Sequence, residues 1–347
     1  MLLVLFLAAL LWGVGHLMGA PRQARLYMIG LLYVAVLGLH LVLPYGHPIR
    51  MATGESAALW LLLGGGAVLV LIYRFGLGKL RARARAKEAA EAPPPQPGRF
   101  SEAELERYAR HIVLRELGGQ GQKKLHQGRV LVIGAGGLGA PALQYLAAAG
   151  VGTIGVIDDD TVENANLQRQ VIHRDRDIGM PKVFSAQAAM RAQNPHVTVQ
   201  PYHRRLTDDI AADLFADYDV ILDGTDNFDS RYLANRTAAA LGKPLVSGAL
   251  SQWEGQLSVF DPAGGAPCYQ CIFPQAPADG LAPSCAEAGV LGPLPGVVGA
   301  MMAVEAVKLL SDAGQPLRGE MLIYDALWGE TRKIALRRRA DCPVCGG

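Results

Sequence analysis

The most informative segment of this sequence is a glycine-rich turn at residues 134–139. It follows Arg129 to Ile133, a short apolar, β-branched run typical of a buried strand, and it leads into an apolar helix that ends near Ala149. This is the G-x-G-x-x-G pattern in the strand–turn–helix setting of nucleotide-binding folds. Glycine lets backbone N–H groups approach a phosphate, and the helix N-terminus favours the anion. The phosphate-binding glycines would be Gly134, Gly136, Gly137 and Gly139.

Strand and helix signals alternate through the rest of the C-terminal part. A second strand is predicted from Thr153 to Ile157, and others at 197–201, 219–223 and 244–248, with helices between them. Alternation of this kind predicts an α/β fold, a Rossmann-like doubly wound and mostly parallel sheet. Ahead of it, residues 101–117 are predicted to be one helix, which starts at a capping box and ends at Gly118.

Polar residues gather where the predicted strands end. Asp158 follows the second strand, about 20 residues after the glycine turn, where it is placed to accept hydrogen bonds from ribose hydroxyls. A dinucleotide such as NAD is the usual first interpretation of this pattern. Arg169 and Lys182 favour a triphosphate instead, because charge builds on a leaving pyrophosphate. Asp226, after the strand at 219–223, is suited to Mg²⁺, which prefers oxygen ligands shared with phosphates.

The N-terminal part has a different composition. Half of the chain is apolar and only 18% is charged, against about 25% in soluble proteins, and the apolar excess lies in residues 1–73. Residues 1–20, 26–43 and 57–73 are free of Asp, Glu, Lys and Arg, and each approaches the roughly 20 residues needed to cross a bilayer. We therefore expect a membrane anchor of three transmembrane helices at 1–73. The first run could instead be a signal peptide, but no basic residue precedes it.

Basic residues predict the orientation of this anchor. Arg22 and Arg25 lie between the first two runs, and six basic residues follow the third: Arg74, Lys79, Arg81, Arg83, Arg85 and Lys87. The turn between the second and third runs carries only Arg50, with Glu55 beside it. The positive-inside rule therefore places the N-terminus outside and the rest of the chain in the cytoplasm, as a multi-pass protein of the cell inner membrane. Residues 74–98 form a basic flank and Pro-rich linker, and 99–347 form the globular domain.

Four of the five cysteines form two C-x-x-C pairs, Cys268 with Cys271 and Cys342 with Cys345. Two such pairs predict a closed four-thiolate site for a structural Zn²⁺, and a cytoplasmic location disfavours disulfides. The fifth, Cys285, lies in a Pro/Gly-rich stretch that we expect to cross the active site as a mobile loop. It is either an inert small hydrophobe or a thiol that takes part in chemistry. A net charge of +2 gives no argument for nucleic acid binding.

Taken together, these motifs resemble the MoeB/ThiF/HesA family of ubiquitin-activating-type adenylyltransferases, and among them the molybdopterin-synthase type most. The resemblance runs from about Arg107 to Gly346. It rests on ordered motifs that include RYARHIVL, VLVIGAGGLGAPALQYLAAAGVG, IDDDTVENANLQRQ, LDGTDNFDSR, PLVSGAL, EGQLSVF, CYQC, CAEAGVLGPLPGVVG and CPVC.

The resemblance implies a role for each matching residue. Asp158 would hold the ribose, and Asp226 would position Mg²⁺ and the reacting centre. Arg110 would reach into the ATP site of a partner subunit, which implies a homodimer. Cys285 matches a residue that some relatives use in a thioester or acyl-persulfide step. The phosphates of ATP would be contacted by Asn166, Arg169 and Lys182.

The implied reaction is ATP-dependent adenylation of the C-terminal glycine carboxylate of a ubiquitin-like sulfur carrier ending in Gly-Gly, with release of pyrophosphate. We expect the carrier to be the small subunit of molybdopterin synthase (MoaD-like). Alternatives are the thiamine-pathway carrier (ThiS-like) or several carriers. A different class of function is a non-catalytic membrane-bound nucleotide sensor, and another is an NAD-dependent enzyme. Sulfur would come from a separate donor, a cysteine desulfurase or rhodanese, and the sheet would carry an antiparallel C-terminal extension.

Overall fold

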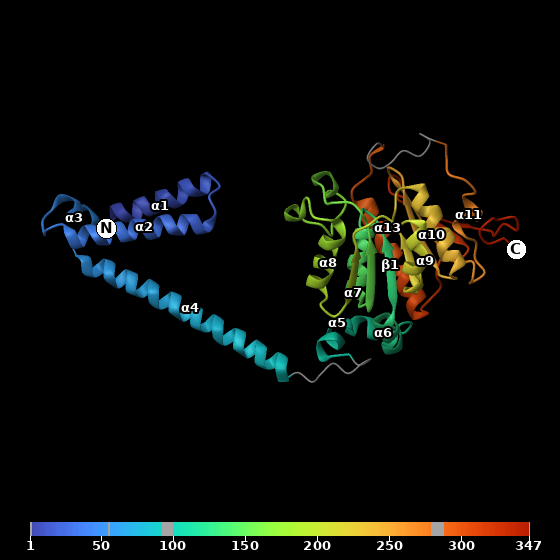
Figure 1. The fold of residues 1–347 in the computed structure, drawn as a ribbon, viewed down its shortest axis with the longest axis horizontal. Helices are drawn as coiled ribbons and strands as arrows, with labels where there is room; N and C mark the ends of the chain where they lie inside the picture. The colour runs from blue at the N-terminus through green and yellow to red at the C-terminus, as the bar shows by residue number, and fades with distance from the viewer. Residues whose placement is uncertain (1, 55, 92–99, 279–287, 347) are drawn as a thin grey trace. The chain divides into compact units, whose positions relative to one another are not determined.

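The computed structural model describes residues 2–54, 56–91, 100–278 and 288–346, without the side chains of residues 82 and 84–91. The chain divides into two compact units, Met1–Pro94 and Pro95–Gly347. The N-terminal unit is helical (Figure 1). Its helices are α1 (Leu2–Leu17), α2 (Arg22–Val42), α3 (Pro48–Thr53) and α4 (Ala57–Glu91).

A small apolar core joins three of these helices. Val4, Val36 and Trp60 are buried against one another, and the Tyr33 hydroxyl donates to the Trp60 carbonyl across 2.7 Å. Gly64 lets the Tyr33 ring approach α4, because a Cβ there would lie 2.0 Å from the hydroxyl oxygen. Most other apolar side chains of these helices are exposed.

Two helices of this unit, α2 and α4 over Ala57–Arg81, are long and apolar enough to cross a membrane. The shorter α1 has 16 residues and spans about 24 Å. The helix α4 continues through the basic flank to Glu91, the last residue described before 92–99, because Arg, Ala, Lys and Glu favour helix. Residues 88–91, predicted as linker, are therefore helical.

The C-terminal unit is built on one sheet of eight strands in the order β3-β2-β1-β4-β5-β6-β7-β8. The strands β3 to β5 in this order are parallel, and β6, β7 and β8 add an antiparallel extension. This confirms the predicted Rossmann-like sheet. The strands are β1 (Arg129–Ile133), β2 (Thr153–Ile157), β3 (Thr198–Tyr202), β4 (Val220–Asp223), β5 (Leu245–Leu250), β6 (Glu254–Phe260), β7 (Glu320–Asp325) and β8 (Glu330–Ala335).

Helices cover both faces of this sheet (Figure 1). Val130 and Val132 of β1 face a core shared with α7, α8 and α13, whereas Leu131 and Ile133 face the core under α9 and α10. Strand side chains alternate in direction, so a strand buried on both sides is apolar throughout. The helices are α5 (Glu102–Ile112), α6 (Gly118–Gln127), α7 (Gly139–Ala149), α8 (Lys182–Gln193), α9 (Asp208–Ala216), α10 (Phe228–Ala240), α11 (Tyr269–Ile272) and α13 (Pro293–Ser311).

The single helix predicted at 101–117 is wrong. The capping box at Ser101 is present, but α5 ends at Ile112 and a turn follows. This turn buries Leu117 while it leaves Val113 and Leu114 exposed. Gly118, with φ of 61°, then begins α6 rather than ending a helix.

The strand order reverses beside β1, which pairs with β2 on one side and β4 on the other. The chain therefore leaves β1 through α7 on one face of the sheet and leaves β4 through α10 on the other face. This divergence opens a crevice at the carboxyl ends of the two strands. The glycine turn follows β1 at this crevice, Asp158 follows β2, and Gly224 to Asp226 follow β4.

Candidate active site

A cleft of about 1140 Å³ lies at the carboxyl ends of the parallel strands. The sequence-predicted residues that line it come from four separate segments of the chain. They are Gly134, Gly136, Gly137, Asp158, Asn166, Arg169, Lys182 and Asp226. The fold thus brings together residues up to 92 positions apart (226 − 134 = 92).

The glycine turn is shaped by two close backbone approaches. Gly134 has φ of 92°, and a Cβ there would lie 3.2 Å from the Gly224 carbonyl oxygen. Gly139 is not among the cleft-lining residues described, but a Cβ there would lie 1.8 Å from the Gly134 carbonyl oxygen. Gly139 is therefore required for the turn to close onto the start of α7.

Asp158 ties the turn to the end of β2. Its Oδ2 accepts from the Ala135 N–H at 2.7 Å, and its Oδ1 accepts from the Asp160 N–H at 2.8 Å. Each carboxylate oxygen keeps a further lone pair. Asp158 therefore orders the loop and still has acceptor capacity for a ribose hydroxyl.

Lys182 is the first residue of α8, and its side chain is only 7% exposed. Its Nζ lies 2.7 Å from Oδ2 of Asp160, and its backbone N–H donates to the Asp160 carbonyl at 2.9 Å. An isolated bridge between Thr161 and Pro181 adds to this pairing. The ammonium group is consequently fixed at the rim of the cleft.

Asn166 and Arg169 lie on the polar segment after β2. Asn166 belongs to a 3-10 turn at Asn164–Asn166, and its Oδ1 accepts from the Glu163 N–H at 3.3 Å. One guanidinium N–H of Arg169 donates to the Ala165 carbonyl at 3.1 Å, which leaves its other donors available to an anion. The neighbouring Gln170 also lines the cleft, is almost fully buried, and has an Oε1 without a partner.

The buried His173 holds the glycine turn through the Ala135 carbonyl. It was not among the site residues predicted from the sequence. It is buried, with Nε2 2.9 Å from the Ala135 carbonyl and Nδ1 2.9 Å from the Ser185 hydroxyl. A carbonyl only accepts, so Nε2 carries a hydrogen. Burial lowers the pKa of this imidazole; Lys182 acts in the same direction, whereas the Ala135 bond and nearby carboxylates oppose it.

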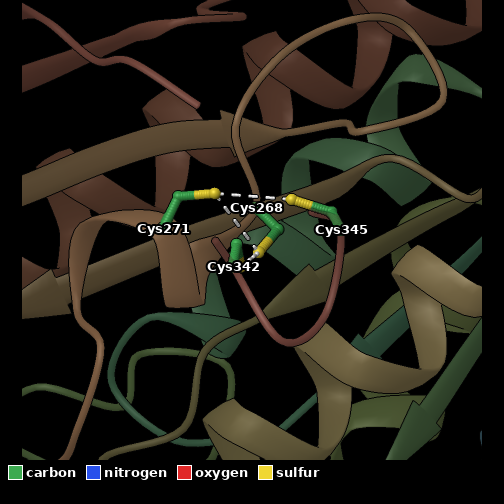
Figure 2. A group of neighbouring side chains, drawn as sticks. All are labelled: Cys268, Cys271, Cys342 and Cys345. Atoms are coloured by element: carbon green, nitrogen blue, oxygen red, sulfur yellow. Dashed lines mark hydrogen bonds between the residues drawn. The ribbon is translucent and has the colours of Figure 1, made fainter. Parts of the chain in front are cut away.

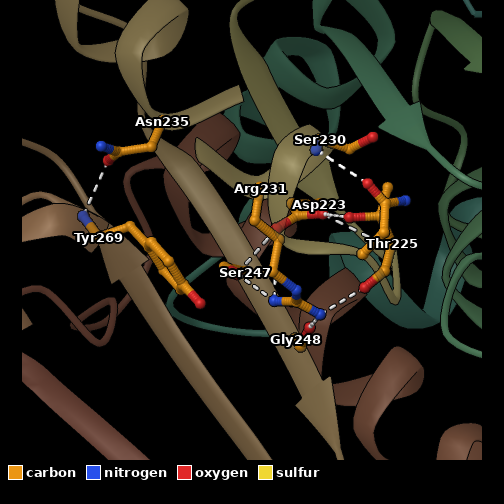
Figure 3. Close-up of polar contacts among 9 residues, drawn as sticks. Asp223, Thr225, Ser230, Arg231, Asn235, Ser247, Gly248 and Tyr269 are labelled. Carbon is orange, nitrogen blue, oxygen red and sulfur yellow. Dashed lines mark hydrogen bonds and ion pairs between the residues drawn. The ribbon is translucent and has the colours of Figure 1, made fainter. Parts of the chain in front are cut away.

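Asp226 is exposed in the cleft, and the loop before it is held by a buried network (Figure 3). Asp223 accepts from the N–H and the hydroxyl of Thr225, at 3.0 and 2.6 Å. The guanidinium of Arg231 lies between this loop and the end of β5. A carboxylate exposed in a cleft that could bind phosphate groups can serve as an oxygen ligand for Mg²⁺.

Arg231 and Asp160 were likewise not among the site residues predicted from the sequence. A signal for Arg231 was available, since an arginine near a helix N-terminus opposes the helix dipole and needs a nearby anion. Asp160 had a weaker signal, as the third acidic residue after β2. Asp223 lies 8 residues from its partner Arg231, and Asp160 lies 22 residues from its partner Lys182. Neither pair has the spacing of three or four residues at which side chains meet on a helix.

The four paired cysteines form a compact cluster (Figure 2). The sulfurs of Cys268 and Cys271 lie 3.9 Å apart, Cys268 and Cys342 lie 3.6 Å apart, and Cys271 and Cys345 lie 3.4 Å apart. Four sulfurs at about 2.3 Å from one zinc ion would lie about 3.8 Å from one another. These separations fit a tetrahedral thiolate site and are far longer than a disulfide bond.

The surroundings of this cluster also suit a metal. The Arg339 N–H donates to the Cys271 sulfur at 3.4 Å, as outer partners of metal thiolates do. Burial raises the pKa of the Cys268 thiol, so a thiolate at this position would require a compensating cation. Gly346 fits only without a side chain, because a Cβ would lie 2.5 Å from the carbonyl oxygens of Ala340 and Cys342.

Two predicted residues are not part of the cleft as described. Arg110 is exposed on α5, and it is not among the described residues that line the cleft. Cys285 lies in 279–287, outside the described residues. The roles predicted for both stay predictions.

Known proteins resemble this chain over the C-terminal unit. The sequence pattern of the ThiF family matches residues 108–344. A "Sulfur carrier protein adenylyltransferase" of Thermus thermophilus is 50% identical over 252 residues, which cover 72% of this chain and 93% of that protein. A "SAMP-activating enzyme E1" of Haloferax volcanii is 51% identical over 243 residues, 70% of this chain and 89% of that protein.

Among solved structures, E. coli MccB with AMPCPP and selenomethionine-labelled MccA has the same fold. The TM-score is 0.62 at 21% identity, over 72% of this chain and 75% of that one.

Proposed function

The chain belongs to the ThiF family and is a nucleotidyltransferase, and on that basis we propose which carboxylate it activates and where it works. It adenylates ubiquitin-like sulfur carriers with ATP. We propose that its carrier is the small subunit of molybdopterin synthase, a MoaD-like protein, in molybdenum cofactor biosynthesis. The CAEAGVLGP segment together with the four-cysteine cluster supports this choice over the thiamine-pathway carrier.

One observation supports the proposal most directly: the glycine turn and two cationic side chains line the same cleft. Arg169 and Lys182 line the same cleft as Gly136 and Gly137. Two positive groups beside a phosphate turn suit a triphosphate and would crowd a nicotinamide ring. This arrangement favours adenylation over the alternative of an NAD-dependent enzyme.

In the proposed step, a carboxylate oxygen of the carrier attacks the α-phosphorus of ATP. A bond forms between that oxygen and phosphorus, the bond to the bridging oxygen breaks, and pyrophosphate leaves with its electrons. Lys182 and Arg169 neutralise the charge that develops, and Asp158 orients the ribose. Asp226 would hold Mg²⁺, which would supply further neutralisation of the phosphates. Such chemistry depends on positioning and charge rather than on a protein nucleophile.

We also propose that the four-cysteine cluster binds a structural Zn²⁺ and that the enzyme is a homodimer. The zinc would hold the loop that carries Cys342 and Cys345 against α11, and the four cysteines are not among the described residues that line the cleft. Arg110, exposed on α5, would complete the ATP site of the partner subunit. The four clustered sulfurs, enough to complete a tetrahedral site, and the exposure of Arg110 support these two assignments.

The N-terminal unit is proposed to anchor the enzyme in the cell inner membrane, with three spans and the catalytic unit in the cytoplasm. Its exposed apolar helices and the basic residues in the second half of α4 support this placement. Protease treatment of sealed spheroplasts tests it. The catalytic unit should survive protease added outside, and its digestion there would overturn the orientation.

Carrier-dependent ATP–pyrophosphate exchange tests the proposed reaction. The full chain in detergent should exchange label with a MoaD-like carrier, while exchange with a ThiS-like carrier alone would favour the thiamine-pathway alternative. Exchange with neither, together with tight Mg·ATP binding, would favour a nucleotide sensor, and a preference for NAD would favour a dehydrogenase.

Asp226→Asn should abolish exchange, because Mg²⁺ loses its ligand. Asp229→Asn is the matched control, since Asp229 is exposed nearby and is not among the described residues lining the cleft. Full exchange by Asp226→Asn would remove the proposed role of Asp226.

A further inference from the structure

Arg231 places a buried positive charge among the residues that line the cleft. Its side chain is 7% exposed, and that of its ion-pair partner Asp223 is 1% exposed. Arg231 lies in the first turns of α10, and its guanidinium points toward the ends of β4 and β5 (Figure 3). Burial of this kind requires every donor to find a partner.

The two terminal nitrogens of Arg231 each make two contacts. One donates to Asp223 Oδ2 at 3.4 Å and to the Ser247 hydroxyl at 3.2 Å. The other donates to the Gly248 carbonyl at 2.8 Å and to the Thr225 carbonyl. These four contacts use the four terminal N–H groups, so none of them remains for a phosphate or a carrier carboxylate.

The groups that Arg231 joins border the reacting centre. The Thr225 carbonyl belongs to the peptide bond that leads into Asp226, and Gly248 lies near the end of β5. The same β4 loop pairs with the end of β1, where the Gly224 N–H donates to the Ile133 carbonyl at 3.0 Å. It also lies against the glycine turn, because a Cβ on Gly134 would lie 3.2 Å from the Gly224 carbonyl oxygen. Movement of this loop would therefore displace Asp226 and disturb the phosphate turn together.

We propose that Arg231 is a positioning residue for adenylation. It fixes the Thr225–Asp226 peptide against β5, so that the Asp226 carboxylate faces the cleft in one orientation, in which it would hold Mg²⁺. This inference rests on the proposed function, because it deepens the account of the same site.

Stability alone is a weak reason for such an arrangement. A buried ion pair can often be replaced by apolar residues of similar volume without loss of stability, whereas removal of one partner leaves an unpaired charge. A planar guanidinium with donors on two nitrogens can bridge four acceptors in fixed directions, and an ammonium group cannot. The four contacts therefore require the fixed directions of the arginine N–H groups, and a positive charge alone would not make them.

The first test compares Arg231→Lys with Arg236→Lys in the full chain. Arg236 lies on the same helix, half exposed, and pairs at 3.1 Å with Asp208. Arg231→Lys should lower kcat of carrier-dependent exchange on the order of 100-fold, as small misplacements do, while KM for ATP changes less than about threefold. Arg236→Lys should change neither. Equal kcat values for Arg231→Lys and the wild type would overturn the proposal.

A second variant guards against misfolding. Asp223→Leu combined with Arg231→Met removes both charges, so no lone charge is buried. It should keep a cooperative thermal transition and yet lose exchange. Wild-type kcat in this double variant would also overturn the proposal.

Amide hydrogen exchange gives a readout that needs no turnover. The Thr225 N–H should exchange at least about tenfold faster in Arg231→Lys than in Arg236→Lys, because the loop opens more often. Equal protection would overturn the positioning role. If the wild type shows no pyrophosphate exchange, the proposed function fails, and this comparison alone decides the role of Arg231.

Discussion

The Lys182 ammonium lies 2.7 Å from the Asp160 carboxylate, with the lysine side chain 7% exposed and that of the aspartate 67% exposed. Lys182 is also the first residue of α8, where the helix dipole disfavours a cation. Asp160 compensates for that charge when no phosphate is present. The pair thus keeps Lys182 directed at the cleft before ATP arrives.

Replacement of Lys182 by Ala should lower kcat of pyrophosphate exchange on the order of 10²- to 10³-fold, because one charge-stabilising donor is lost. Steady-state kinetics with a saturating carrier measures this. Lys124→Ala is the control, since Lys124 makes an ion pair of similar length with Asp312 on an exposed surface. The control should keep wild-type kinetics, and an equal loss in both variants would argue against a specific role for Lys182.

Loss of one thiolate from the cysteine cluster should destabilise the C-terminal unit. Cys271→Ser should reduce bound zinc, measured by mass spectrometry of metal content, and lower Tm by at least about 10 °C. Cys285→Ser should leave the zinc content unchanged, because the four clustered thiols already make up a complete tetrahedral set. A zinc-free wild-type protein with the same Tm as the loaded protein would contradict the structural role.

The stability of the catalytic unit should fall in mild acid because of His173. Burial lowers the pKa of this imidazole, so the folded state binds fewer protons than the unfolded chain. The stabilisation is complete above the unfolded pKa of about 6.5 and is lost as pH falls from there through the folded pKa. The free energy of unfolding should decrease by at most about 1.4 kcal/mol per pH unit, as urea titrations at pH 7.5, 6.5 and 5.5 would show. The slope should be flatter in His173→Gln and unchanged in His203→Gln, whose imidazole is exposed; equal slopes would exclude His173 as the source.

Two helical glycines should respond to alanine in opposite directions. Gly139→Ala places a Cβ 1.8 Å from a backbone oxygen, and it should destabilise the fold by more than about 2 kcal/mol. Gly296→Ala, in α13, meets nothing within 4 Å and should stabilise by up to about 1 kcal/mol. Thermal unfolding of the two variants side by side measures this, and destabilisation by both would contradict the geometry.

Local patterns predicted the sheet and the phosphate turn well. The apolar run of β1, the glycines after it and Asp158 are close in sequence, so their spacing carries the structure. The cysteine cluster was also predictable, because the C-x-x-C spacing by itself places two thiols close enough to bind one metal ion. These features need no knowledge of how distant segments pack.

The rest depended on contacts between distant segments. His173 meets Ala135 across 38 residues, and Arg231 meets Gly248 across 17, so neither contact has a short-range signature. The break between α5 and α6 likewise follows from the burial of Leu117 against the domain core, which outweighed the helix preference of the segment.

The apolar helix α13 has a consequence for how the protein is made. Pro293–Ser311 is long and apolar enough to be mistaken for a bilayer span, yet half of it is buried against α7, β5 and β6. All three of these partners precede α13 in the chain, so during synthesis its docking surface emerges from the ribosome first. The order of the elements thus lets the nascent chain bury α13 against these partners as soon as the helix is synthesised.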